Sequence, residues 1–313
     1  MWEEMKADSS VFVMGEDIGA YGGAFKVTEG FLDEFGADRV IDTPISEAAI
    51  VGAAIGAAHM GLKPICEMQF IDFIGSAFDI IVNFAAKVRY RTGVGAGIVI
   101  RGPCGAGGRA GPFHSQNVES YFANVAGLKM VAPATVYDAK GLLKSAIRDP
   151  DPVLFFEHKF LYRRIKDDLP TDTDFVVPLG RARTHREGSD LTIVTYGAML
   201  YTVEQAADRL AEEENVQVEI IDLRTLRPLD VDAITASVRK TGRLLIVHEA
   251  PSFGGFAGEI TAQVSEEAFA WLDAPIRRVA ALDTPVPYAA PLEDAHLPTV
   301  DDVLATARGQ LAY

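Results

Sequence analysis

The stretch that decides the fold class is KMVAPATVYDAKGLLKSAIRDPDPVLFF, residues 129–156. It opens with the apolar run Lys129-Met130-Val131 and continues through a helical pattern from about 136 to 147. It closes with the apolar run Val153-Leu154-Phe155-Phe156. A strand, a helix and a strand in this order predict two parallel strands joined by a crossover helix.

The same alternation extends toward both ends of the chain. A polar segment that begins at 167 and carries Pro170 and Pro178 interrupts it. We therefore predict an α/β fold in which a parallel sheet with helices on both faces (1–166) is followed by a linker (167–186) and a smaller α/β unit (187–313). The further expected strands are 11–14, 39–41, 64–66, 98–101, 191–194, 218–221, 244–247 and 278–280. The further expected helices are 46–60 with Ser46 as its N-cap, 73–90, 203–213, 231–240, 257–271 and 300–311.

Composition excludes several classes of protein. Lys plus Arg is 29 and Asp plus Glu is 44, so the net charge of -15 argues against nucleic-acid binding. Cys66 and Cys104 lie too far apart in sequence for a disulfide framework or a paired-cysteine metal site. The longest apolar stretch, Ala48–Ala58, is too short to span a bilayer. We expect a cytoplasmic protein that binds neither nucleic acid nor membrane.

The common nucleotide and hydrolase motifs of α/β chains are missing. No G-x-G-x-x-G follows a strand, and no Gly-Lys-Ser/Thr, H-E-x-x-H or G-x-S-x-G occurs. The chemistry must therefore come from other segments.

Two segments place a titratable residue at a strand end. In Thr43-Pro44-Ile45-Ser46-Glu47, the acid falls in the first helical turn and could simply complement the helix dipole. Alternatively, burial among Ile45, Ala48 and Ile50 would favour a protonated carboxyl at the edge of the sheet where ligands bind. The glycine-rich loop Gly102–Gly111 is either a plain connector or the segment that delivers His114 to a cleft.

Two other segments also allow two interpretations. In Glu67–Phe73, the aromatic residues Phe70 and Phe73 are either core residues or a platform that stacks a flat heterocycle. Glu16 and Asp17, flanked by glycines, form either a turn or a pair of buried acids that line a cavity.

Taken in order, these segments resemble a known family. VMGEDIG (13–19), DTPISE (42–47) and FHSQ (113–116) are similar to motifs of the beta subunit of the 2-oxo acid dehydrogenase first component. The resemblance covers essentially the whole chain, and KVRYRTG (87–93) and 155–163 look most like the branched-chain members. Further matching motifs are DAKGLL (138–143), IDLRT (221–225), HEAP (248–251) and GGF (254–256).

The resemblance implies a transketolase-like fold and a thiamine diphosphate site shared between two subunits. In this family the alpha subunit holds the diphosphate and Mg²⁺ through a Gly-Asp-Gly motif, which this chain lacks. The implied partners are that alpha subunit, in a heterotetramer, and a lipoyl acyltransferase component. The implied reaction is oxidative decarboxylation of a branched-chain 2-oxo acid or pyruvate, with transfer of the acyl group to a lipoyl domain.

The resemblance also implies roles for individual residues. Glu47 matches the acid that protonates the aminopyrimidine ring, and His114 matches the histidine that helps pass the acyl group to the lipoyl arm. Ile45 matches a residue whose carbonyl contacts the exocyclic amine, Gln69 and Phe73 match positions beside the pyrimidine, and Glu16 resembles an acid in the passage between paired sites. Phe73 stands where branched-chain members often have Tyr, so a hydroxyl hydrogen bond is lost. A structural potassium site would use Ile98, Val99, Ala146, Asp149 and Asp151.

Two other functions remain open at this point. One is an acetoin-cleaving or other transketolase-like thiamine enzyme subunit. The other is a non-catalytic scaffold of the same fold, against which the presence of both Glu47 and His114 argues.

Overall fold

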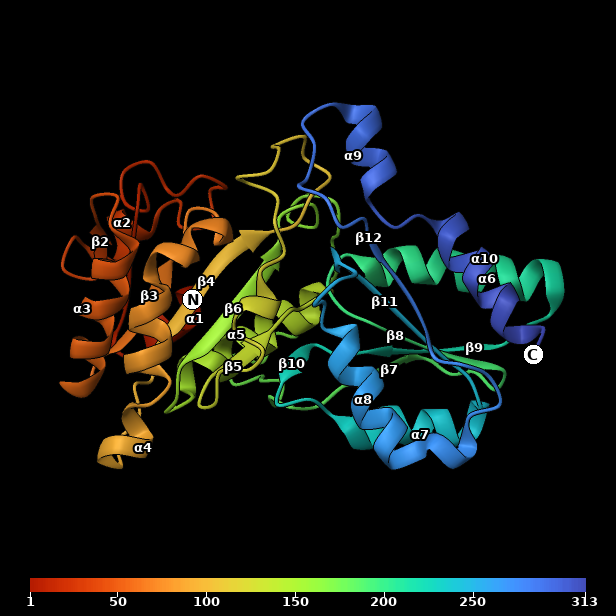
Figure 1. Ribbon diagram of the computed structural model, residues 1–313. Helices are drawn as coiled ribbons and strands as arrows, with labels where there is room; N and C mark the ends of the chain where they lie inside the picture. Colours follow the sequence, from red (N-terminus) through yellow and green to blue (C-terminus); the bar gives the residue numbers. More distant parts are fainter.

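The computed structural model describes residues 1–313 and contains two α/β units, each built around one sheet (Figure 1). The first sheet has seven strands and the second has five. In spatial order, the strands of the first sheet are β10 (Thr225–Arg227), β5 (Lys129–Val131), β6 (Val153–His158), β4 (Val99–Cys104), β3 (Lys63–Glu67), β1 (Val11–Gly15) and β2 (Val40–Asp42).

The first sheet is parallel except at one edge. Val13 pairs with Val40 of β2 and with Ile65 of β3, which places β1 between these two strands. The exception is β10, which lies antiparallel to β5 with Thr225 opposite Val131. This three-residue strand comes from the second half of the chain, so it ties the two units together.

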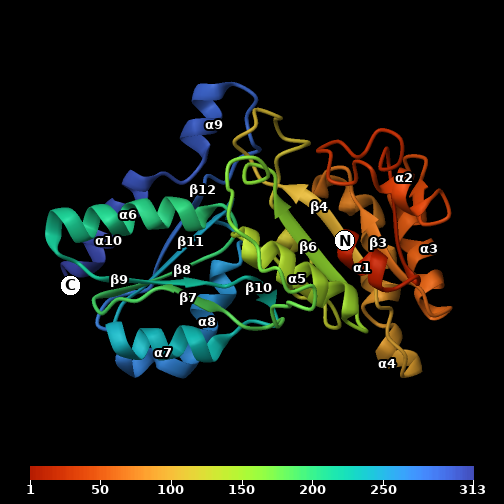
Figure 2. The ribbon, with the colours of Figure 1, turned by 180° about the vertical axis from the view of Figure 1, so that it is seen from behind.

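The second sheet is parallel except for β7. Its three inner strands are buried along almost their whole length, as expected when helices cover both faces, whereas its two edge strands are more exposed. Figures 1 and 2 show α6 and α10 on one face and α7 and α8 on the other. In spatial order, its strands are β12 (Arg277–Ala281), β11 (Leu244–Pro251), β8 (Leu191–Thr195), β9 (Val218–Asp222) and β7 (Arg183–Arg186), the last of which lies in the segment expected to be a linker.

Alternate side chains of the first sheet enter two different cores. Phe12 and Met14 of β1 pack with α3 and the irregular helices that follow β3. Val11 and Val13 pack with α1 and α5 on the opposite face. The α-helices are α1 (Trp2–Ala7), α2 (Phe31–Phe35), α3 (Glu47–His59), α4 (Val88–Thr92), α5 (Val136–Arg148), α6 (Met199–Glu214), α7 (Val231–Thr241), α8 (Ala257–Ala268), α9 (Ala290–His296) and α10 (Val300–Leu311).

The prediction of one long helix over 73–90 is wrong. The chain forms a 3-10 helix η1 (Ile71–Ala77), a π-helix η2 (Ile80–Ala85) and then α4. Gly75 weakens helix propensity, and the β-branched run at 80–82 crowds a regular turn. The wider π turn is closed by Ala86, whose N–H donates to the carbonyl of Ile81. The remaining short 3-10 helices are η3 (Glu119–Tyr121) and η4 (Phe269–Trp271).

Two further local expectations need correction. Helix α3 does begin after Ser46, but the Ser46 side chain makes no capping hydrogen bond. The loop expected from Gly102 starts later, because β4 continues to Cys104 and pairs Gly102 with Phe156. No helix in the structure is both long and apolar enough to cross a bilayer.

Candidate functional site

Three of the sequence-predicted segments leave the first sheet at the same edge. β1, β2 and β3 are adjacent and parallel, so their carboxyl ends lie together. Glu16 follows β1, the segment that leads to Glu47 follows β2, and Gln69 follows β3. The carboxyl edge of a parallel sheet is the usual place for a ligand site in an α/β fold.

The turn after β1 is shaped by close contacts to its neighbours. The Gly19 N–H donates to Oδ1 of Asp42 at 2.6 Å, which ties this turn to the end of β2. A Cβ at Gly19 would lie 2.4 Å from the other oxygen of the same carboxylate, so only glycine fits there. Asp17 adopts a left-handed conformation, with φ of 57°, and its carboxylate accepts from Nε2 of Gln69 at 3.1 Å.

The two acids at this edge differ in exposure. Glu16 is 6% exposed, and its Oε1 has no hydrogen-bond partner. Burial raises the pKa of Glu16, and the nearby carboxylates of Glu47 and Asp17 raise it further. Glu47 is the first residue of α3 and is partly exposed.

Of the two interpretations of Glu47, enclosure among Ile45, Ala48 and Ile50 does not hold within this chain. Ile50 is buried, but Ile45 is 82% exposed and Ala48 is exposed. The reason is that α3 packs on the sheet with its opposite side, through Ile50, Val51, Ala54 and Ile55. Only another molecule could bury Glu47 completely.

The glycine-rich loop brings His114 to the segment that follows β3. The ring centroid of His114 lies 4.7 Å from that of Phe70 and 5.5 Å from that of Phe73, both edge to face. Phe25 packs edge to face on Phe70 at 5.5 Å and extends the aromatic cluster. Phe70 and Phe73 are half-buried, so they line an open edge rather than the core. The sequence analysis missed Phe25, whose only signal was an aromatic residue just beyond the glycine-flanked turn.

A row of charged residues lies beneath this edge. Arg101 of β4 is 1% exposed and forms ion pairs with Glu67 of β3 and Glu157 of β6. Its Nε donates to Glu157 at 2.6 Å, and the Tyr162 hydroxyl donates to the same carboxylate at 2.6 Å. Arg101 lowers the pKa of Glu157, whereas burial dominates at Glu67 and raises its pKa. The network ties three neighbouring strands together at their carboxyl ends.

The two segments expected to hold potassium do lie against each other. A Cβ at Gly97 would lie 2.9 Å from the carbonyl oxygen of Asp149, and Val99 of β4 pairs with Val153 just beyond Asp151. The side-chain carboxylates there already have partners, because Lys129 donates to Asp149 and Arg89 donates to Asp151. The backbone carbonyls of Ile98 and Ala146 also accept hydrogen bonds already, from the N–H groups of Val153 and Asp149, and each keeps a second lone pair for a cation.

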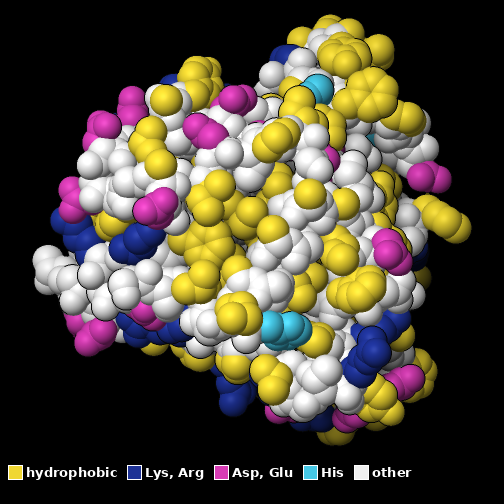
Figure 3. All heavy atoms as spheres, turned by 90° about the vertical axis from the view of Figure 1, so that its left-hand side faces the viewer, with side chains coloured by type: hydrophobic (Ala, Val, Ile, Leu, Met, Phe, Trp, Pro, Cys, Tyr) yellow, Lys and Arg dark blue, Asp and Glu magenta, His cyan; other side chains and the backbone are white.

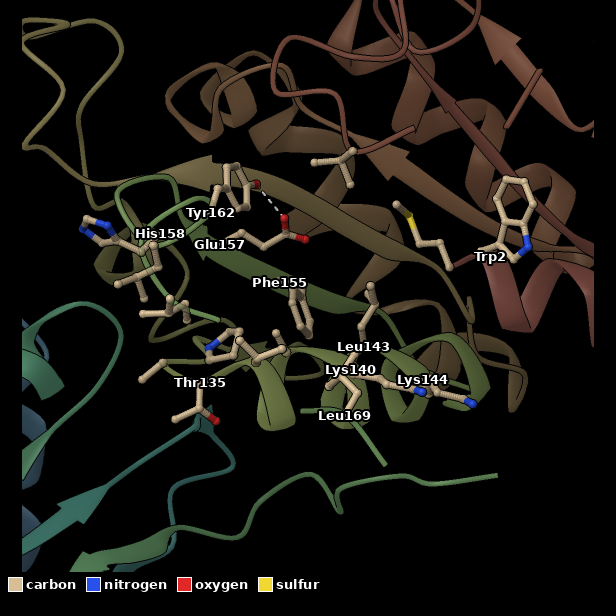
Figure 4. Close-up of a pocket in the computed structure, with 18 of the residues that line it drawn as sticks. Trp2, Thr135, Lys140, Leu143, Lys144, Phe155, Glu157, His158, Tyr162 and Leu169 are labelled. Carbon is tan, nitrogen blue, oxygen red and sulfur yellow. Dashed lines mark hydrogen bonds between the residues drawn. The ribbon is translucent and has the colours of Figure 1, made fainter. Parts of the chain in front are cut away.

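A cavity of about 480 Å³ lies on the face of the first sheet that α5 covers, between α5, β6 and the N-terminal residues (Figure 4). Its walls include Trp2, Leu143 and Phe155, and none of the predicted site residues lines it. Its charged groups already have partners, because Lys140 and Lys144 pair with Glu3 while Glu157 pairs with Arg101. The carboxyl edge of the sheet is therefore the better candidate site.

Comparison with known proteins identifies the family of this chain. Residues 1–164 match the family model of the transketolase pyrimidine-binding domain, and residues 180–303 match that of the transketolase C-terminal domain. The chain is 50% identical to the 2-oxoisovalerate dehydrogenase subunit beta of Bacillus subtilis, over 98% of this chain and 94% of that protein. The chain belongs to the family of 2-oxo acid dehydrogenase E1 beta subunits.

Other relatives fit the same E1 beta family. The chain is 45% identical to the pyruvate dehydrogenase E1 component subunit beta of Bacillus subtilis, over 99% of this chain and 95% of that protein. Among solved structures, a split-gene transketolase described as an inactive beta4 tetramer aligns with a TM-score of 0.79 and 23% identity, over 99% of this chain and 94% of that one. This likeness extends the transketolase fold to the whole chain.

Proposed function

We propose that this chain is the beta subunit of a thiamine diphosphate-dependent 2-oxo acid dehydrogenase. With an alpha subunit it would decarboxylate a branched-chain 2-oxo acid or pyruvate and transfer the acyl group to a lipoyl domain. The observation that carries the proposal is the pair Glu16 and Glu47 at the carboxyl edge of a pyrimidine-binding domain. Identities of 50% to a 2-oxoisovalerate dehydrogenase subunit beta and 47% to a pyruvate dehydrogenase E1 component subunit beta support the family and keep both acids as candidate substrates.

The residues present fit the pyrimidine half of the cofactor. Glu16 has a buried carboxyl oxygen without a hydrogen-bond partner. Glu47 is the first residue of α3, and Ile45, two residues before it, is 82% exposed. Glu47 would hold a proton at a ring nitrogen, while the Ile45 carbonyl would accept from the exocyclic amine. Gln69 and Phe73 would flank the ring. When bound, the cofactor supplies the electron sink for decarboxylation.

His114 is suited to a later step. Its ring contacts Phe70 and Phe73 edge to face. It is half-buried, so it is not enclosed in the core. We assign it the transfer of the acyl group to the lipoyl arm, in which an imidazole can serve as a general acid or base.

An alpha subunit is the expected partner because the chain offers only half of a site. It has no Gly-Asp-Gly motif for the diphosphate and Mg²⁺. Helix α3 leaves Ala49, Ala53 and Gly56 uncovered, and Ile45 before it and Met60 at its C-cap are exposed as well. Figure 3 views the side that carries α3 and shows hydrophobic side chains gathered across it. An exposed apolar face of this kind marks an interface, and we propose a heterotetramer with the alpha subunit.

The proposal includes a cytoplasmic location, for which the two buried free thiols of Cys66 and Cys104 give support. Some relatives are mitochondrial proteins, so cell fractionation is the test. Recovery of the chain with an organelle or membrane fraction would refute this part.

The test is calorimetric titration of thiamine diphosphate with Mg²⁺ into the chain alone and into the chain assembled with its alpha subunit. Binding only to the assembly, followed by decarboxylation of 3-methyl-2-oxobutanoate or pyruvate, is the expected result. The preferred acid then identifies the complex. Tight binding to the chain alone, or an assembly that turns over neither acid, would refute the proposal. Glu212→Gln, an exposed acid on α6, is the matched control for acid substitutions at the edge.

A further inference from the structure

The loop that carries His114 is anchored at its base within the first unit. The Gly105 N–H donates to the carbonyl of Gln116 at 3.1 Å, and the Gln116 N–H donates to Asp72 Oδ1 at 2.9 Å. Between these points, residues 105–111 include four glycines, three of which have positive φ. Glycine loses more conformational freedom on ordering than any other residue, so a fixed path for this loop requires specific anchors.

Glu293 of α9 supplies one anchor from the second unit. Its side chain is fully buried, and Oε1 accepts from the backbone N–H groups of Gly107 at 3.0 Å and Arg109 at 3.3 Å. Its Oε2 accepts from Nη1 of Arg109 at 2.7 Å. Figures 1 and 2 both show α9 beside the loop that follows β4. A buried carboxylate that accepts three hydrogen bonds, one of them from a guanidinium group, is a strong tether.

Glu249 of β11 supplies a second anchor close by. Its Oε1 accepts from the Ala106 N–H at 2.6 Å and from Asn117 Nδ2 at 2.9 Å, and its Oε2 pairs with His158 Nε2 at 2.7 Å. The neighbouring His158 and these donors lower the pKa of Glu249 to about 2 despite its burial, so it is a carboxylate at neutral pH. The second unit therefore holds the loop through two carboxylates.

The end of the loop also rests on the second unit. A Cβ at Gly111 would lie 2.1 Å from the ring of Tyr288, so the backbone packs directly on that ring. His114 follows three residues later and turns back toward Phe70 and Phe73. Only Pro112 and Phe113 separate this contact from His114.

We propose that Glu293 is a positioning residue, whose carboxylate fixes the 105–111 loop so that His114 is held against Phe70 and Phe73 for acyl transfer. This assigns a function to the second unit, which otherwise contributes no residue to the site. The assignment to acyl transfer rests on the proposed function. The anchoring of the loop by Glu293 does not depend on it.

The test uses the complex of the chain with its alpha subunit and compares two partial reactions. One is decarboxylation with an artificial electron acceptor, and the other is reductive acylation of a free lipoyl domain. In Glu293→Ala we expect kcat for acylation to fall about 10-fold or more, while decarboxylation and KM for the 2-oxo acid change less than about 2-fold. Glu293→Gln keeps the shape and one acceptor oxygen, so it should recover part of the acylation rate.

The matched control is Asp294→Asn. Asp294 is the next residue of α9 and contacts the same arginine, at 2.7 Å from Nη2, but its side chain is 63% exposed and accepts no backbone N–H of the loop. An exposed ion pair contributes little, so this variant should leave both partial reactions within about 2-fold of wild type.

Two further readouts separate positioning from general damage. Hydrogen exchange of the 105–111 amides should accelerate about 10-fold in Glu293→Ala, with no change in β8 or β11. Adding Glu293→Ala to His114→Ala should cost no further acylation, because the two residues act as one unit. Equal losses in both partial reactions, additive losses in the double variant, or unchanged loop exchange would overturn the inference. A wild-type complex that decarboxylates neither 2-oxo acid would refute the proposed function instead. In that case the hydrogen-exchange result alone would show whether Glu293 fixes the loop.

Discussion

His248 predicts a specific pH dependence of stability. It lies on β11, is fully buried, and stacks on Tyr196 with the rings 19° apart, and neither of its ring nitrogen atoms has a hydrogen-bond partner. Burial lowers its pKa from 6.5 to about 4, and Arg278 acts in the same direction. The folded protein therefore holds a neutral ring in conditions where the unfolded chain would bind a proton.

The sign and size of the effect follow from this difference. As pH falls below 6.5 the unfolded state gains a proton first, so the stability contribution is present above that pH and is lost on the way down to about 4. For these two pKa values the unfolding free energy falls by about 2 kcal/mol between pH 7 and pH 5, and by about 3 kcal/mol over the whole window.

The assay is urea unfolding followed by intrinsic fluorescence at several pH values between 4 and 7.5, for wild type and His248→Phe. The larger phenylalanine ring must repack against Gly255, because Gly255 lies close to the His248 ring. The absolute stability of the variant will therefore differ from that of wild type. The informative quantity is therefore the slope with pH, which should be shallower in the variant by the amounts above. His59→Phe, at an exposed end of α3, is the control and should keep the wild-type slope. A difference between wild type and His248→Phe that stays constant from pH 7.5 to pH 4 would refute the reasoning.

Three other outcomes are expected. Arg101→Met leaves Glu67 and Glu157 buried without their shared partner, and thermal or urea unfolding should show a loss of about 3–5 kcal/mol; a loss below about 1 kcal/mol would mean that the network relaxes or takes up water. Glu47→Gln in the assembled complex should lower the decarboxylation rate about 100-fold or more, because the proton held at the ring is lost, and a variant as active as wild type would show that the site is misassigned. Replacing K⁺ by Li⁺ in the buffer should lower the melting temperature if backbone carbonyls near Asp149 bind potassium, and identical melting curves would contradict that site.

Local patterns in the sequence were sufficient to predict most strands and the residues at their ends. Short apolar runs alternating with helical patterns predicted the two α/β units, because periodicity and strand length depend on neighbouring residues only. The prediction of one helix over 73–90 was wrong because tertiary packing selected 3-10 and π turns over a regular helix. Likewise, propensity could not reveal β10, a three-residue strand stabilised only by its pairing with β5.

By itself, then, the sequence determined the fold class, the acids that follow β1 and β2, and the loop that ends at His114. Only the tertiary structure decided that His114 meets Phe70, that Ile45 beside Glu47 is left uncovered, and that Glu293 holds the glycine-rich loop. The physical reason is distance along the chain. Gly107 and Glu293 are 186 residues apart, so their contact depends on how two separate cores dock and leaves no periodic or local trace in the sequence.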